Sequence, residues 1–195
     1  MRLVLASRNA HKLRELHELM APHELVALPD SVTLPPETGT TFDENALAKA
    51  RTAAAATGEP ALADDSGIEA AALGGAPGVR SARFAGEYAD DAENLSKLLA
   101  EVNRSGDTRV AYVAALALVL GDGEEVVVGG RCEGWLTHEP RGEGGFGYDP
   151  AFVPADLDDG RTMAELSARE KEAISHRGRA ARALLAHLDA DGRGR

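Results

Sequence analysis

The chain is poor in aromatic side chains and contains almost no cysteine. Phenylalanine, tyrosine and tryptophan make up 4% of its 195 residues, so the core must consist mostly of Ala, Val and Leu. The single cysteine, Cys132, cannot form an internal disulfide. This cysteine usage is typical of a protein kept in a reducing compartment.

Long apolar runs and an excess of positive charge are missing as well. No run approaches the roughly 18 apolar residues of a membrane-spanning helix, and MRLVLASRNAHK becomes polar too soon for a signal peptide. We therefore expect a cytoplasmic protein that does not enter a membrane. The formal net charge of −11 disfavours stable nucleic-acid binding, which depends on basic surfaces. A small phosphorylated ligand is compatible with this charge if cations are placed locally.

The remaining composition is that of an ordinary globular protein, with 44% hydrophobic and 27% charged residues. We expect one domain over residues 1–190, with two lobes, and a frayed tail over residues 191–195. Strands and helices alternate, with a hairpin in the middle, which predicts an α/β fold on a mixed sheet. The expected strands are 2–6, 25–28, a strand leading into Asp64, and a hairpin over 109–135 that turns at 121–123. The expected helices are 7–20, 41–57, 91–103 and a C-terminal helix that includes residues 181–188. The stretches 74–90 and 139–154 are expected to be irregular loops.

Two predicted helix starts are candidates for binding anions or metal. In SRNAHK, a strand-to-helix junction offers backbone N–H groups and the helix dipole, with Ser7, Asn9 and Lys12 as further donors. The next helix offers Asp43, Glu44, Asn45 and Lys49, and Glu44 stands three residues after Thr41, which is the pattern of a capping box. Plain N-capping is sufficient to explain both stretches and is the more common reason for such residues, so neither establishes a ligand site by itself.

The most informative stretch is ALADDSGIEA, in which Asp64 and Asp65 follow an apolar run. Ionised acids are seldom buried without partners, so positive charge is expected beside them. Carboxylates together with phosphate are typical of Mg²⁺ sites. Adjacent residues of an extended strand point to opposite faces, so a bend at Ser66 and Gly67 is needed if both acids serve one site. The alternative is an Asx turn with solvated acids.

Aromatic and basic residues gather in two later stretches. In GGFGYDPAFVP, glycines let the backbone approach a ligand, and Phe146 and Tyr148 suit stacking on a base. In EKEAISHRGRA, Lys171, His176 and Arg177 lie near a helix start, where Arg suits phosphate and His suits a base edge or proton transfer. The alternatives are a glycine-rich turn with its aromatics in the core, and a solvated helix turn.

Taken in order, these stretches resemble the inosine/xanthosine triphosphate pyrophosphatase family over nearly the whole chain. The matching segments are SRNAHK, TFDENALAKA, LADDSGIEAAALGGAPGVRSARFAG, EPRGEGGFGYDPAFVP and AELSAREKEAISHRG. The resemblance implies a mixed central sheet flanked by helices, with two lobes around a deep nucleotide-binding cleft, in a homodimer. It also implies Mg²⁺-dependent hydrolysis of dITP, ITP or XTP to the monophosphate and pyrophosphate. This activity would clean the nucleotide pool and prevent incorporation of these nucleotides into DNA and RNA.

The resemblance also implies roles for individual residues. Asp65 would accept a proton and bind metal together with Glu44, and Asp64 and Lys12 would complete the catalytic group. Substrate would be bound by Ser7, Asn9, Lys12, Ser66, Phe146, Gly147, Tyr148, Asp149, Lys171, His176 and Arg177, and by the backbone of Arg8, Ala10 and His11. The residues alone leave open how Asp64 and Asp65 divide their roles. They also leave open a nucleotide sensor without activity and a pyrophosphatase that acts on modified pyrimidines.

Overall fold

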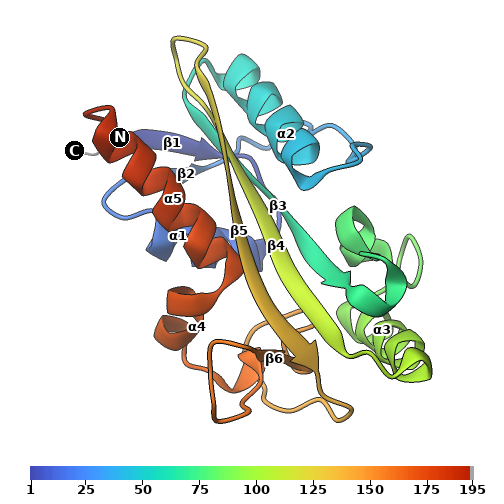
Figure 1. Ribbon diagram of the computed structural model, residues 1–195. Helices are drawn as coiled ribbons and strands as arrows, with labels where there is room; N and C mark the ends of the chain where they lie inside the picture. Colours follow the sequence, from blue (N-terminus) through green and yellow to red (C-terminus); the bar gives the residue numbers. More distant parts are fainter. Residues whose placement is uncertain (194–195) are drawn as a thin grey trace. The chain divides into compact units, whose positions relative to one another are not determined.

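The computed structural model describes residues 1–193, in which strands and helices alternate along most of the chain (Figure 1). The strands are β1 (Arg2–Leu5), β2 (Glu24–Ala27), β3 (Ala61–Ala70), β4 (Arg109–Val119), β5 (Glu125–Leu136) and β6 (Phe152–Pro154). The α-helices are α1 (Ala10–Leu19), α2 (Phe42–Thr57), α3 (Asp91–Ser105), α4 (Ala168–Ile174) and α5 (His176–Ala190). The 3₁₀ helices are η1 (Ala71–Leu73), η2 (Gly78–Arg83) and η3 (Met163–Glu165).

The strands form one six-stranded sheet in the order β2-β1-β3-β4-β5-β6. Strand β1 runs parallel to both β2 and β3, with Leu5 opposite Ala27 on one side and Leu62 on the other. Strand β6 runs antiparallel to β5. The sheet is therefore mixed, and the predicted α/β fold with flanking helices is confirmed.

Local patterns in the sequence correctly predicted where several elements begin or end. Helix α2 begins at the predicted capping box, where Thr41 and Glu44 bond to each other's backbone N–H groups, and it ends at Gly58 in the left-handed conformation. The predicted hairpin is also present, with its turn closed by a hydrogen bond from Gly123 N–H to the Leu120 carbonyl. These features depend on residues a few positions apart, which is why the sequence predicts them well.

Two predictions about the loops are wrong. Strand β3 does not end near Asp64, because it continues to Ala70. The bend at Ser66 and Gly67 that a shared site for both acids would need is therefore not present. The stretch 139–154 is also not entirely irregular, because its end forms β6 by pairing Phe152 with Leu136 of β5. Both segments are held extended by partners distant in the sequence. The stretch 74–90, which was also expected to be irregular, contains the whole of η2, from Gly78 to Arg83.

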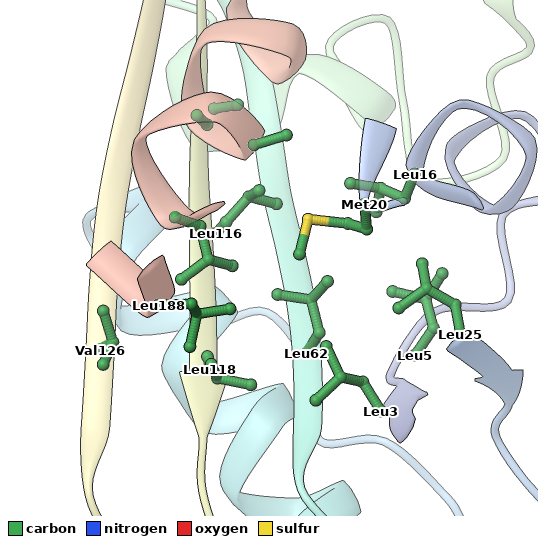
Figure 2. Packing of buried hydrophobic residues seen from close by; sticks show 14 of the residues in the cluster. Leu3, Leu5, Leu16, Met20, Leu25, Leu62, Leu116, Leu118, Val126 and Leu188 are labelled. Carbon is green, nitrogen blue, oxygen red and sulfur yellow. The ribbon is translucent and has the colours of Figure 1, made fainter. Parts of the chain in front are cut away.

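The chain divides into two compact units. The first comprises Met1–Asp65, Ala114–Gly130 and the chain from Arg177 onward, and the second comprises Ser66–Val113 and Arg131–His176. The core of the first unit joins leucines of β1, β3 and β4 to the apolar faces of α1 and α5, as the close-up in Figure 2 shows. In β3 the contribution is Leu62, which is fully buried. In this unit β3 therefore shares a core with α1 and α5, two helices that are far apart in the sequence.

The second unit has its own core. Ile68 and Ala70 of β3 pack there with Leu98 of α3 and with Phe152 of β6. Cys132, the single cysteine, is buried in the same cluster. The aromatic ring of Tyr112 stacks on Phe152 with centroids 4.5 Å apart, so two of the few aromatic residues help to fill this core.

Two further predictions concern membrane entry and the tail. Within residues 1–193, no helix is both long enough and apolar enough to cross a membrane. Helix α5 ends at Ala190, where the frayed tail was predicted to begin. Gly194 and Arg195 of that predicted tail lie outside the described residues.

Strand β3 passes close to η2 at Gly67, and this contact gives a stability prediction. A Cβ at Gly67 would overlap Ser81 Oγ and the Gly78 carbonyl, whereas a Cβ at Gly121 would meet no atom within 4 Å. We expect Gly67→Ala to lower the free energy of unfolding by about 1–3 kcal/mol, as overpacking commonly does. Gly121→Ala is the matched control and should change it by less than about 0.5 kcal/mol. Urea titration of both variants measures the difference, and equal midpoints would contradict the close approach.

Candidate functional site

The residues singled out from the sequence fall in both compact units. The first unit contains the residues predicted to hold phosphate and metal, which are Ser7, Arg8, Asn9, Ala10, His11, Lys12, Glu44, Asp64, Asp65 and Arg177. The second contains those predicted to contact the nucleotide or its base, which are Ser66, Phe146, Gly147, Tyr148, Asp149, Lys171 and His176.

The junction between β1 and α1 is a well-formed helix cap. Asn9 Oδ1 accepts hydrogen bonds from the backbone N–H groups of His11 and Lys12, at 2.9 and 3.2 Å. Ser7 Oγ accepts one from Asn9 N–H. The Arg8 guanidinium donates to the carbonyls of Leu28 and Pro29, so its side chain is held against the loop that follows β2. The Lys12 ammonium of this junction lies 2.6 Å from Asp64 Oδ2.

Asp64 is a buried carboxylate held by two cations. Its side chain is 0% exposed and lies 2.6 Å from Lys12 Nζ and 3.0 Å from Arg177 Nε. Burial by itself would raise the pKa of the Asp64 carboxyl, but the fields of Arg177 and Lys12 outweigh burial and hold the pKa well below its usual range. Asp64 is therefore ionised and paired.

Asp65 forms its hydrogen bond and its ion pair with residues of α2. Asn45 Nδ2 donates to Asp65 Oδ2 at 3.0 Å, and Lys49 Nζ lies 3.5 Å from Oδ1. Lys49 is shared, because it lies only 2.6 Å from Glu37 Oε1 and donates to the Asp64 carbonyl at 2.8 Å. Burial raises the pKa of Asp65, Lys49 opposes this and Glu37 adds to it, so the pKa is raised overall. Asp65 is the less neutralised of the two acids.

Glu44 serves as a capping residue at the start of α2. Its Oε2 accepts hydrogen bonds from Thr40 N, Thr40 Oγ1 and Thr41 N. The hydrogen bond from Thr40 N–H is the main reason that the pKa of Glu44 is lowered. All of these bonds end on one oxygen, and the side chain is exposed. The other oxygen, Oε1, takes none of them.

The two predicted metal ligands, Glu44 and Asp65, do not belong to a compact group of three ligand residues. Within the described part of the chain, the one set of three carboxylate or histidine ligand atoms lying within 4.8 Å of one another is Glu124, His187 and Asp191. Arg193 already neutralises Glu124 at 2.6 Å. Glu44 and Asp65 offer carboxylate oxygens, which are ligands of the kind that Mg²⁺ prefers.

In the second unit, Asp149 organises the glycine-rich loop. Its Oδ2 accepts from the Phe146 backbone N–H at 2.9 Å and from Lys171 Nζ at 2.8 Å, and its Oδ1 accepts from the Tyr112 hydroxyl at 3.0 Å. Lys171 Nζ also lies 5.1 Å from the centre of the Phe146 ring. The half-buried Phe146 ring and a cation are therefore set side by side.

The two aromatic residues of this loop have different environments. Tyr148 is buried, and its hydroxyl donates to the Ser81 carbonyl at 2.7 Å. Its side chain therefore lies in the core, as expected for a glycine-rich turn that buries its aromatic residues. Burial raises the pKa of Tyr148 beyond its ordinary value. Between the two aromatics, Gly147 adopts a positive φ of 62° and donates its N–H to Asp91 of α3 at 2.8 Å.

The two remaining predicted residues of the second unit lie inside it. His176 is buried, and its ring stacks on Tyr112 with centroids 4.7 Å apart. Ser66 is half-buried within β3. Tyr112 therefore contacts both His176 and Asp149, which links two of the predicted residues.

Sequence reasoning missed several residues that contact the predicted ones. In the first unit these are Glu15 and Glu37, and in the second they are Tyr112 and Asp91. Two other contacts, Asn45 and Lys49, were named from the sequence as polar residues of their helix but were given no role. Asn45 and Lys49 are four residues apart on an alanine-rich helix and therefore share a face, and polar residues among buried alanines need a partner.

Comparison with known proteins gives consistent results. The Ham1 family model matches residues 3–187. A protein from Mycobacterium bovis named dITP/XTP pyrophosphatase is 54% identical, over 96% of this chain and 95% of its own length. The crystal structure of a protein named nucleoside-triphosphatase / dITP/XTP pyrophosphatase from Mycobacterium abscessus is 48% identical and superimposes with a TM-score of 0.75, covering 95% of this chain and 99% of that one.

A second solved structure, that of a HAM1 protein from Coxiella burnetii, superimposes with a TM-score of 0.87. It is 43% identical and covers 97% of this chain and 99% of that one. Sequence and fold agree over almost the full length, and we conclude that this chain belongs to the Ham1 family.

Proposed function

We propose that this chain hydrolyses the triphosphates of deaminated purines, dITP, ITP and XTP, to the monophosphate and pyrophosphate. The observation that carries the proposal is the 54% identity, over 96% of the chain, to a protein named dITP/XTP pyrophosphatase. Removal of these nucleotides before their incorporation into DNA and RNA is the proposed role. The homodimer, the cleft between two lobes and the cytoplasmic location implied by the family resemblance stay predictions.

The first unit supplies the groups needed to handle a triphosphate. Lys12 Nζ, the Asn9 amide and the Ser7 hydroxyl are donors at one helix start, where the helix dipole also favours an anion. Asp65 would take a proton from an attacking water or orient it, and the contacts of its carboxylate with Asn45 and Lys49 support this role. Neutralisation of the leaving pyrophosphate by nearby cations lowers the barrier to its departure.

A divalent cation fits the donor chemistry of the first unit. Asp65 is buried, and its charge is only partly neutralised by Lys49, which it shares with Glu37. The capping hydrogen bonds of Glu44 end on Oε2, so Oε1 takes no part in them. We propose that these two carboxylates hold Mg²⁺ together with the substrate phosphates. When bound, the ion would withdraw electrons from phosphoryl oxygens and stabilise charge that develops on them.

Base choice is proposed to depend on the second unit. Phe146 offers a half-buried ring beside Lys171, which suits stacking on a purine. Hypoxanthine and xanthine carry a 6-oxo group where adenine has an amino group, so a donor such as a backbone N–H or His176 would favour the oxo form. Guanine shares this oxo group and must be rejected at position 2, where it carries an amino group. A mismatched polar group in such a site lowers the rate by orders of magnitude.

The substrate panel comes first among the tests. We expect purified protein with Mg²⁺ to release pyrophosphate from dITP and XTP at least about 100-fold faster than from dATP and dGTP. Chelation with EDTA should abolish release, and added Mg²⁺ should restore it. Release from modified pyrimidines alone would favour a different base choice. Tight nucleotide binding without release would identify a sensor and overturn the enzymatic proposal.

The proton-acceptor role of Asp65 predicts a selective loss of turnover. Asp65→Asn should lower kcat for dITP by about 10²–10⁴-fold, because it removes a base positioned for proton transfer. Asp43→Asn is the matched control, since Asp43 is an exposed acid on the same helix, and it should leave kcat unchanged. Circular dichroism must show that both variants are folded. Retention of full activity by the Asp65 variant would remove this residue from the mechanism.

The stacking role of Phe146 predicts a change in substrate affinity. Phe146→Ala should raise KM for dITP about tenfold or more, which corresponds to losing roughly 1–3 kcal/mol of stacking. Tyr88→Ala serves as the control, because Tyr88 is an almost fully exposed aromatic residue of the same unit. If Phe146→Ala instead lowers the melting temperature and leaves KM unaltered, the ring is a core residue.

A further inference from the structure

Tyr112 of β4 contacts two of the residues that are proposed to surround the base. Its hydroxyl donates to Asp149 Oδ1 at 3.0 Å, and its ring stacks on His176 with centroids 4.7 Å apart and an interplanar angle of 14°. All three side chains are buried. They come from β4, from the glycine-rich loop and from the start of α5, so one side chain of β4 connects two separate segments of the second unit.

The ring of Tyr112 lies between two other rings. Phe152 stacks on it with centroids 4.5 Å apart and an interplanar angle of 28°. Two rings at such distances from one face of a third ring would overlap each other, so Phe152 and His176 lie on opposite faces of Tyr112. Aromatic pairs at these separations attract each other beyond the area that they bury. The imidazole of His176 is therefore oriented by a stack that begins at Phe152 in the core of the second unit.

The hydroxyl of Tyr112 shares the Asp149 carboxylate with two other donors. These are the Phe146 backbone N–H at 2.9 Å and the Lys171 ammonium at 2.8 Å, both on Oδ2. Removing a donor from a buried carboxylate leaves an acceptor unsatisfied and weakens the other hydrogen bonds of the network. A change at the Tyr112 hydroxyl should therefore also alter the positions of Phe146 and Lys171.

We propose that Tyr112 is a positioning residue for base recognition, which holds the Phe146 loop through Asp149 and the His176 imidazole through its own ring. A base that stacks on Phe146 while its edge meets His176 needs both groups in fixed relative positions, because small displacements weaken oriented contacts steeply. The hydroxyl and the ring of Tyr112 belong to one rigid, planar group and can fix them together. The proposal rests on the proposed function for its ligand, a nucleotide of a 6-oxopurine.

The main test compares the binding of inosine monophosphate (IMP) and AMP by calorimetric titration, because both carry a base and need no turnover. Tyr112→Phe removes the hydroxyl and keeps the ring, and should weaken IMP binding about fivefold to tenfold. Tyr112→Leu also removes the stack, and should lower the preference for IMP over AMP by about tenfold or more. Binding of inorganic tripolyphosphate, which has no base, should change by less than about twofold in both variants.

Val102→Ala separates positioning from core packing. Val102 is fully buried on α3 in the same core cluster as Tyr112, but it offers neither a hydrogen bond to Asp149 nor an aromatic ring to His176. This variant should have a lower melting temperature and unaltered binding of IMP and AMP. If the Tyr112 variants also keep IMP binding, or lose IMP, AMP and tripolyphosphate equally, Tyr112 is only a core residue and the proposal is overturned.

A double-mutant cycle tests the connection through His176. In a His176→Ala background, Tyr112→Leu should weaken IMP binding no more than Tyr112→Phe does, within about twofold, because the stack no longer orients an imidazole. An undiminished extra loss would contradict this connection. If Tyr112→Leu does not fold, Tyr112→Phe decides by itself, since unchanged IMP binding by that variant contradicts the connection through Asp149.

The proposed function and the inference fail in different ways. If the unaltered protein prefers IMP to AMP but releases no pyrophosphate from dITP, the proposed function fails and the binding measurements still decide the role of Tyr112. If the protein is active and the Tyr112 variants keep its ratio of kcat/KM for dITP to that for dATP, the proposed function stands and the inference fails. An unaltered protein that binds IMP and AMP alike would overturn both.

Discussion

Two adjacent carboxylates in a buried strand need separate cations, and strand geometry places those cations on opposite faces. Asp64 and Asp65 both lie within β3, where successive side chains alternate. Asp64 meets Lys12 of α1 and Arg177 of α5, and Asp65 meets Asn45 and Lys49 of α2. Because an unpaired buried charge is strongly destabilising, this pairing constrains the placement of three helices around β3.

The pairing is unequal, and this inequality supports the proposed difference in role between the two acids. Asp64 has two close cations, Lys12 and Arg177, which compensate the charge of its carboxylate. The carboxylate in turn holds both of these side chains in place. Asp65 shares Lys49 with Glu37, so part of its charge is uncompensated. A partly neutralised carboxylate attracts a metal ion or a proton. This physical difference supports Asp65 as the reactive acid, a distinction that neighbouring aspartates in a sequence do not reveal.

The second unit uses a buried carboxylate for a similar purpose. Asp149 holds the Phe146 backbone, the Lys171 ammonium and the Tyr112 hydroxyl at once. A loop that contains three glycines between residues 144 and 147 would otherwise have many conformations. The aromatic ring at its tip is therefore presented by a structured loop, while Tyr148 is committed to the core.

Local patterns in the sequence determined the caps of α2, the hairpin turn, the mixed α/β class and the family, because each depends on residues close together or on ordered motifs. The tertiary structure alone decided that β3 continues past both acids, that Phe152 pairs with β5, and that Tyr148 faces inward. It also decided the partners of Asp64. Arg177 lies 113 residues from Asp64 in the sequence, and a cation that distant becomes a neighbour only when the core of the first unit brings α5 against the sheet.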